Sequence, residues 1–139
     1  MTDKVFVDTN VFVYLFDRNA RVKQARAAAL VEEEAEAIVI STQVLQEFYV
    51  TVTRKLGKPL PEPEAEAAVR RLATLSVVDT DVDLVLAAVT SSRRHRISYW
   101  DALIVEAALR GECRRLLTED LQHGRRFADL TVENPFLDA

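Results

Sequence analysis

Cysteine and histidine are nearly absent from this sequence, which has one cysteine, Cys113, and two histidines, His95 and His123. A single cysteine cannot form an intrachain disulfide, and the three residues do not have the spacing of a structural zinc site. Glycine and proline are also scarce, at three and four residues. Because this composition leaves little room for linkers, we expect one compact domain over residues 1–139, without disulfide or zinc.

Long apolar runs and an excess of basic charge are also missing. No stretch approaches the roughly 20 apolar residues that a membrane span needs, and the first residues lack the form of a signal peptide. We therefore expect a cytoplasmic protein that does not contact the membrane.

The chain has 18 Lys and Arg against 22 Asp and Glu, a formal net charge of −4. This balance argues against nucleic-acid binding by bulk attraction to phosphates, but it does not exclude a nuclease with an acidic site.

Hydrophobic patterning predicts strands that alternate with helices. Apolar, often β-branched runs predict buried strands at Lys4–Asp8, Ala37–Ile40, Ser76–Val78, Arg115–Thr118 and Leu130–Val132. Helical patterns lie between them, at Val11–Phe16, Arg21–Glu36, Gln43–Leu56, Glu62–Leu75, Val82–Arg94 and Ile97–Gly111. This alternation predicts an α/β fold, a three-layer α/β/α sandwich with a central parallel sheet of four to five strands.

Four acids stand in apolar surroundings at points that this fold would bring together. Asp8 ends the first predicted strand, Glu47 lies in the third helix, Asp101 begins the last helix, and Asp120 follows the fourth strand. If right-handed crossovers place the first and fourth strands side by side, Asp8 and Asp120 leave neighbouring strand ends. Carboxylates about 4 Å apart repel by roughly 4 kcal/mol at an effective dielectric of 20, so such a cluster takes up protons or cations. Oxygen ligands of this kind suit Mg²⁺ or Mn²⁺.

Each acid also has a purely structural interpretation. Asp8 suits the N-cap of the first helix, and Ser98 with Asp101 fits a capping box. Asp120 suits the cap of a short helix over Leu121–Arg126. The remaining acid, Glu47, lies in the middle of a helix, where its structural alternative is an ion pair with Lys or Arg. Acids follow both the first and the fourth strands, and this joint pattern favours one shared functional site over four separate structural roles.

Four segments between Val5 and about Gly124 carry a family resemblance: VDTNVFVYLF, STQVLQEFYVTVTRKL, SYWDALIVEAAL and LLTEDLQHG. In order and spacing they resemble the motifs of PIN-domain ribonucleases, and specifically the short VapC-like toxins of bacterial toxin–antitoxin modules. The resemblance implies a PIN-like fold for the whole chain. It also implies that the family's metal-binding acids correspond to Asp8, Glu47, Asp101 and Asp120, and that Asn10 and Thr118 are the supporting polar residues.

A metal-dependent endoribonuclease is the activity that this resemblance implies. One or two Mg²⁺ or Mn²⁺ ions held by the four acids would lower the pKa of a water molecule for attack on an RNA phosphodiester, and would offset the charge that develops there. Tyr99, beside Trp100, and the pair Arg125 and Arg126 are candidate RNA contacts. The family also implies a homodimer that inhibits growth or translation, and a cognate antitoxin protein that silences it.

Other classes of protein fit this pattern less well. A phosphatase of the haloacid dehalogenase type needs a second aspartate two positions after the first, where this chain has Asn10. A phosphoacceptor receiver domain needs paired acids at the first strand and a lysine after the last. The main alternative is an inert PIN-fold module that binds RNA or acts as a scaffold. Such a module is expected to have lost its acids, whereas all four are present here.

Overall fold

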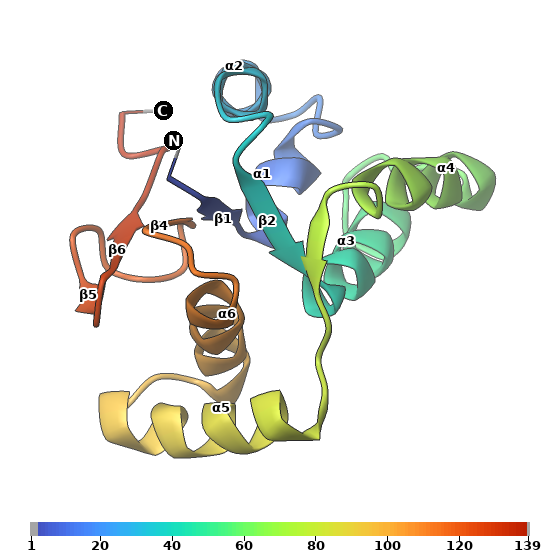
Figure 1. The fold of residues 1–139 in the computed structure, drawn as a ribbon. Helices are drawn as coiled ribbons and strands as arrows, with labels where there is room; N and C mark the ends of the chain where they lie inside the picture. The colour runs from blue at the N-terminus through green and yellow to red at the C-terminus, as the bar shows by residue number, and fades with distance from the viewer. Residues whose placement is uncertain (1–2, 139) are drawn as a thin grey trace.

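A six-stranded sheet with the order β3-β2-β1-β4-β6-β5 lies at the centre of the computed structural model, which describes residues 3–138 (Figure 1). The strands are β1 (Val5–Val7), β2 (Ile38–Ser41), β3 (Ser76–Val78), β4 (Arg115–Leu117), β5 (Arg126–Phe127) and β6 (Leu130–Glu133). Neighbouring strands pair in parallel from β3 to β6, and only the two-residue β5 pairs antiparallel. The predicted parallel sheet is confirmed, with β5 as an additional edge strand.

Helices cover both faces of the sheet (Figure 1). One face carries α1 (Thr9–Tyr14), α2 (Arg21–Glu33), α3 (Thr42–Arg54) and α4 (Glu62–Leu72), and the other carries α5 (Val82–His95) and α6 (Tyr99–Arg110). The three-layer α/β/α architecture predicted from the sequence is therefore confirmed. Within residues 3–138, every helix is too short or too polar to cross a bilayer.

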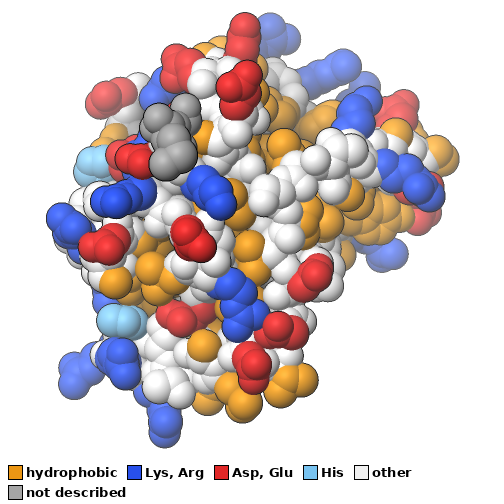
Figure 2. Space-filling view, viewed as in Figure 1, with side chains coloured by type: hydrophobic (Ala, Val, Ile, Leu, Met, Phe, Trp, Pro, Cys, Tyr) orange, Lys and Arg blue, Asp and Glu red, His pale blue; other side chains and the backbone are white. Residues whose placement is uncertain are grey.

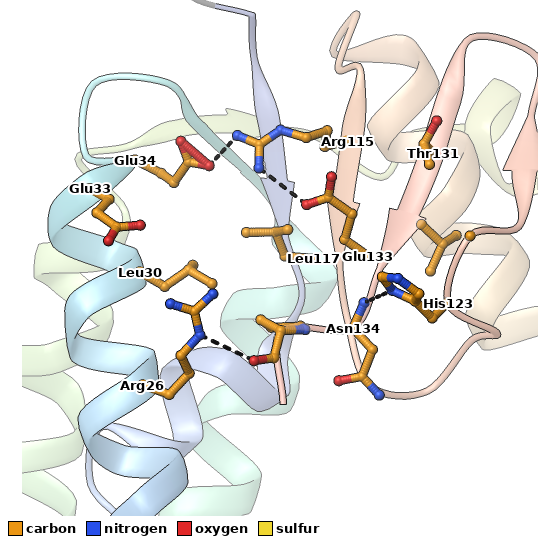
Figure 3. Close-up of a pocket in the computed structure, with 13 residues that line it drawn as sticks. Arg26, Leu30, Glu33, Glu34, Arg115, Leu117, His123, Thr131, Glu133 and Asn134 are labelled. Carbon is orange, nitrogen blue, oxygen red and sulfur yellow. Dashed lines mark hydrogen bonds and ion pairs between the residues drawn. The ribbon is translucent and has the colours of Figure 1, made fainter. Parts of the chain in front are cut away.

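Acidic and basic side chains alternate over the face of the molecule drawn in Figure 2. One hollow on the surface, of about 370 Å³, lies between α2 and the strands β4 and β6 (Figure 3). There Arg115 forms ion pairs with Glu34, the residue that follows α2, and, at 3.2 Å, with Glu133 of β6. None of the four candidate acids lines this hollow. These two ion pairs tie the end of α2 to the sheet.

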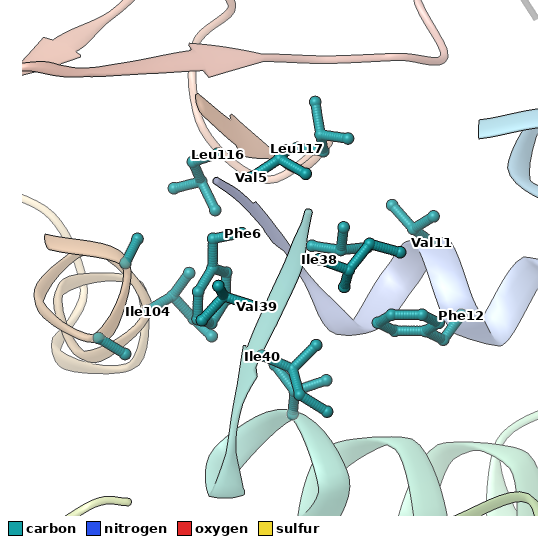
Figure 4. Close-up of a cluster of buried hydrophobic side chains, with 14 of the residues drawn as sticks. Val5, Phe6, Val11, Phe12, Ile38, Val39, Ile40, Ile104, Leu116 and Leu117 are labelled. Atoms are coloured by element: carbon teal, nitrogen blue, oxygen red, sulfur yellow. The ribbon is translucent and has the colours of Figure 1, made fainter. Parts of the chain in front are cut away.

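Apolar side chains fill the space between the sheet and both helical layers. Figure 4 shows Phe6 and Val39 facing Ile104 of α6, while Phe12 of α1 lies near Ile38 on the opposite side of the sheet. All five are at most 4% exposed. Burial of an aliphatic or aromatic side chain of this size stabilises a fold by about 1.5–3 kcal/mol. Because the central strands β1 and β2 are covered on both faces, they are buried at every position, whereas β6 at the side of the sheet alternates buried and partly exposed residues.

The parallel pairing of β1 with β4 decides where the candidate site lies. Val7 stands opposite Leu117 in the register, so the next residue of each strand, Asp8 and Thr118, leaves the sheet at the same edge. Ligands of open α/β sheets bind outside this carboxyl edge. The fold thus confirms the predicted adjacency of the first and fourth strands.

Some element boundaries differ from those predicted. Helix α1 begins at Thr9 rather than Val11, because the side chain of Asp8 accepts a hydrogen bond from the Thr9 amide and caps the helix. The short helix considered over Leu121–Arg126 does not form. Gly124 instead has a positive φ of 87° and donates its amide hydrogen to the carbonyl of Val132, which leads the chain into β5.

Candidate active site

Asp8 is a buried carboxyl at the junction of β1 and α1, with 5% of its surface exposed. Its Oδ1 accepts a hydrogen bond from the Thr9 amide at 2.7 Å, and its Oδ2 accepts one from the Thr118 hydroxyl at 2.7 Å. Burial raises the pKa of Asp8 to about 7, although both hydrogen bonds oppose the rise. The negative charges of Asp120 and Glu47 contribute in the same direction as burial. The capping role considered for Asp8 is confirmed, and it coexists with a carboxyl that resists ionisation.

Thr118 and Asn10 connect Asp8 to Asp120. The fully buried Thr118 hydroxyl accepts hydrogen bonds from the Asp120 amide at 3.1 Å and from Asn10 Nδ2 at 3.5 Å. Asn10 Nδ2 also donates to Asp120 Oδ2 at 3.2 Å. Both residues predicted to support the acids therefore contact them. The hydroxyl that donates to Asp8 also fixes the loop that carries Asp120.

Glu47 and Asp120 approach this network from more exposed positions. Glu47 Oε1 lies 3.5 Å from the Thr9 hydroxyl, which donates to it. Burial of the carboxyl raises the pKa of Glu47, and the charges of Asp120 and Asp101 raise it further, while hydrogen bonds from Gln43 and Thr9 oppose the rise. Burial likewise raises the pKa of Asp120, and Asp101 is its largest source of repulsion. The two carboxyls are thus held in an environment that is short of positive charge.

Asp101 completes the set from the first turn of α6. Its amide donates to the Ser98 hydroxyl at 3.0 Å, so the cap considered for this helix is confirmed. The Asp101 charge acts on both Glu47 and Asp120. Over residues 3–138, however, no three Asp, Glu, His or Cys side chains come close enough to form a ready metal-binding group. The four acids repel one another across the site without converging, and their role as metal ligands stays a prediction.

The donor chemistry at this edge fits a hard divalent cation. Besides the four carboxylates, the site contains Oδ1 of Asn10, a buried acceptor without a hydrogen-bond partner among the described residues. An unpaired buried acceptor costs about 1–3 kcal/mol, which a ligand can recover. Carboxylate and amide oxygens are the ligands that Mg²⁺ and similar ions take. Hydrogen bonds of Thr118 and of Asn10 Nδ2 link Asp8 to Asp120, and these two acids together with Asn10 Oδ1 are candidate ligands for such an ion.

The side chains considered for RNA contacts lie in different environments. Tyr99 is partly buried against the core, and its ring meets that of Trp100 edge-on at 5.0 Å. Arg125 lies 4.8 Å from the centroid of the Phe127 ring and donates at 2.8 Å to a main-chain carbonyl at the end of α5. Arg126 is exposed on β5. Their contact with RNA stays a prediction, and it is Trp100 that presents an aromatic ring to solvent.

Sequence reasoning missed a polar cluster beside Asp120. Glu119 accepts hydrogen bonds from the Tyr14 hydroxyl and, at 3.0 Å, from Lys23 Nζ. Lys23 Nζ also lies 5.0 Å from the centroid of the Tyr14 ring. Lys23 and Glu119 are far apart in sequence and share no motif, so no spacing signal pointed to this pair. The cluster anchors the loop between Thr118 and Asp120 to α1 and α2.

Comparison with known proteins gives one family match and several related structures. Residues 5–129 match the model of the PIN domain family. No curated protein matches the chain. The sarcin-ricin loop cleaving toxin VapC20 of Mycobacterium tuberculosis is 20% identical with a TM-score of 0.67, over 81% of this chain and 87% of that one. A toxin-antitoxin complex from Klebsiella pneumoniae is 18% identical with a TM-score of 0.71, over 95% and 98%.

A third solved structure, VapBC2 from Rickettsia felis bound to a DNA fragment from its promoter, is 19% identical with a TM-score of 0.64, over 94% of this chain and 97% of that chain. At these identities the likeness to the three structures concerns the fold. The family match rests on the sequence itself and spans most of the chain.

Proposed function

Because this chain belongs to the PIN domain family, we propose that it is a metal-dependent endoribonuclease, the toxin of a toxin–antitoxin module. The observation that carries the proposal is the buried Asp8 carboxyl, whose pKa is raised to about 7, joined through Thr118 and Asn10 to Asp120 at the carboxyl edge of the sheet. Carboxyl groups with strongly raised pKa values are concentrated at functional sites of proteins. The structural neighbour described as a sarcin-ricin loop cleaving toxin supports RNA as the substrate.

The residues have distinct roles in this proposal. Asp8, Asp120 and Asn10 Oδ1 hold one Mg²⁺ or Mn²⁺ ion, and Glu47 and Asp101 bind directly or through water. When bound, the ion would lower the pKa of water and offset negative charge on the phosphodiester during hydrolysis. Thr118 keeps Asp8 oriented by donating its hydroxyl hydrogen, and the Asn10 amide keeps Asp120 oriented. The substrate phosphate approaches the open side of the site, where Glu47 and Asp120 are exposed.

Protein partners follow from the same proposal. Two of the structural neighbours are toxin–antitoxin complexes, and these support a cognate antitoxin for this chain. A homodimer is supported by α5, on which Val82 and Leu86 are 73% and 59% exposed one helical turn apart. Such a toxin would act on RNA in the cytoplasm and inhibit growth or translation.

The experiment that tests the activity uses purified chain and single-stranded RNA with Mg²⁺, Mn²⁺ or EDTA. We expect cleavage only with a divalent ion, products with 5′-phosphate and 3′-hydroxyl ends, and loss of cleavage in Asp101→Asn. Asp129→Asn is the matched control, because it removes one exposed acid on the turn between β5 and β6. RNA that is bound but left intact under all conditions would instead identify an inert RNA-binding module. Cleavage that persists in EDTA and in Asp101→Asn would contradict the proposal.

A further inference from the structure

A pocket of about 330 Å³ lies beside the acids, between α3 and the first turn of α6. Its walls include Gln43, Glu47 and Val50 of α3, Lys55 directly after this helix, and Trp100 of α6. Glu47 belongs both to this pocket and to the candidate site, so the two adjoin at this residue. The volume is at the lower end of the range for small-molecule sites. It suits a single planar group rather than a large ligand.

Trp100 forms the apolar wall of this pocket. The side chain is 63% exposed, although tryptophan is usually well buried. The Tyr99 ring meets the indole edge-on, and Gln43 Nε2 donates to the main-chain carbonyl of Trp100 at 3.2 Å, which fixes the backbone that carries the indole. Val50, 48% exposed, adds apolar surface on the α3 side. The indole thus contacts Tyr99 and is otherwise largely uncovered, immediately before Asp101 in the sequence.

Two polar groups of the pocket have unused binding capacity. Gln43 is 4% exposed, and its Oε1 has no hydrogen-bond partner in the part of the chain that the structure describes. The oxygen has almost no solvent-accessible surface, so a ligand in the pocket reaches this acceptor only when the Gln43 side chain shifts towards it. At the other end of the pocket, Lys55 follows the last residue of α3 and places a cation about two helical turns beyond Glu47. The pocket therefore combines an aromatic wall, an unpaired acceptor and a cation.

We propose that this pocket binds one unpaired nucleobase of the RNA, stacked on Trp100, next to the phosphodiester that is cleaved. The inference rests on the proposed function, because the acids must act on RNA for a base to lie here. Exposed aromatic rings are the usual stacking platforms for single-stranded nucleic acid, and a nearby Lys neutralises the adjoining phosphate. A second protein covering Trp100 would not explain why the pocket adjoins the acidic site at Glu47, nor the cation beyond it.

The test uses the fact that Trp100 is the only tryptophan of the chain. Stacking of a base on its indole quenches its fluorescence, so titration with a short single-stranded oligoribonucleotide reports on this pocket alone. Asp120→Asn with Mg²⁺ keeps the RNA intact during the titration, and anisotropy of labelled RNA measures binding independently. We expect quenching by the oligoribonucleotide and none by a strand of the same length without bases.

The second test compares the cleavage kinetics of variants at Trp100. Removing one stacking platform lowers affinity by between about 5-fold and about 150-fold, so Trp100→Ala is expected to lower kcat/KM within this range, mainly through KM. Trp100→Phe keeps a ring and is expected to recover most of the loss. Val22→Ala is the control, because Val22 is 67% exposed on α2 and does not line the pocket. Thermal unfolding of Trp100→Ala at the same temperature as the wild type would show that the substitution leaves the folded structure intact.

The outcomes separate this inference from the proposed function. If the wild-type chain cleaves RNA and Trp100→Ala has the same KM, the nucleobase pocket is refuted and the nuclease proposal stands. Fluorescence that changes with protein concentration alone would show a second copy over Trp100, and this also refutes it. If the wild-type chain neither binds nor cleaves RNA, the proposed function fails and this inference fails with it.

Discussion

Replacing Asp8 by Asn is expected to stabilise the protein in the absence of divalent ions while abolishing cleavage. Asp8 is buried, and its pKa is raised from the ordinary value of 3.8 to about 7. The folded protein therefore binds a proton at Asp8 more tightly than the unfolded chain does. The stability associated with this group is greatest below about pH 4 and is lost as the pH rises towards 7. Asn has a similar shape and no charge, so it removes this loss.

The size of the effect follows from the shift in pKa. A rise of about three units corresponds to about 4 kcal/mol of folding free energy lost between pH 4 and pH 7. The amide offers one oxygen where the carboxylate accepts from both Thr9 and Thr118, and losing one of these bonds costs about 1 kcal/mol. Asp8→Asn should therefore be about 3 kcal/mol more stable than wild type at pH 8, and slightly less stable at pH 4.

Urea unfolding at pH values between 4 and 8 in EDTA measures this difference. Asp129→Asn is the control, because its carboxyl is exposed and its substitution should leave the pH dependence unchanged. The comparison isolates Asp8, because the other acids titrate in both wild type and variant. A stability difference between wild type and Asp8→Asn that is the same at every pH would refute the reasoning.

Three further substitutions test the remaining parts of the account. Thr118→Val removes the hydroxyl that contacts Asp8, Asp120 and Asn10, so cleavage assayed with Mn²⁺ should fall about 10- to 100-fold; full activity would exclude a supporting role. Lys23→Met removes the half-exposed ion pair to Glu119, and it should cost at most about 1 kcal/mol in urea unfolding while lowering kcat through the loop of Asp120. An unchanged kcat would show that the cluster serves stability alone. Phe6→Ala, in the fully buried centre of β1, should cost about 3–5 kcal/mol in the same assay, and a loss below 1 kcal/mol would contradict the observed packing.

The layers of the fold were predictable from the sequence because apolar runs and helical patterns alternate so regularly. Right-handed crossovers allowed the first and fourth strands to lie side by side, which would bring Asp8 and Asp120 to one edge, and the observed parallel pairing of β1 with β4 confirms this adjacency. Strand β5 was not predictable, because two residues carry no periodicity. It forms through a turn in which Ala128 has a positive φ of 53°, a conformation that its sequence does not signal.

The candidate acids were named from the sequence, but their electrostatic environment was not predictable from it. In the structure the charges of Asp8, Glu47, Asp101 and Asp120 act on one another, yet among the described residues they form no ready metal-binding group, so their role as ligands stays a prediction. The degree of burial that raises the pKa of Asp8 depends on packing by residues far along the chain. The position of Trp100 on an open wall, rather than in the core, depends equally on how α6 rests against α3.

The central claim is that the acids hold a divalent cation, and calorimetric titration of Mn²⁺ at pH 7 tests it most directly. Because the pKa of Asp8 is about 7, binding should release about half a proton from this carboxyl, seen as a dependence of the heat on the ionisation enthalpy of the buffer. Asp8→Asn and Asp120→Asn should each weaken binding, and Asp8→Asn should lose the proton release. Binding of equal affinity in all three proteins, or none in the wild type, would contradict the account.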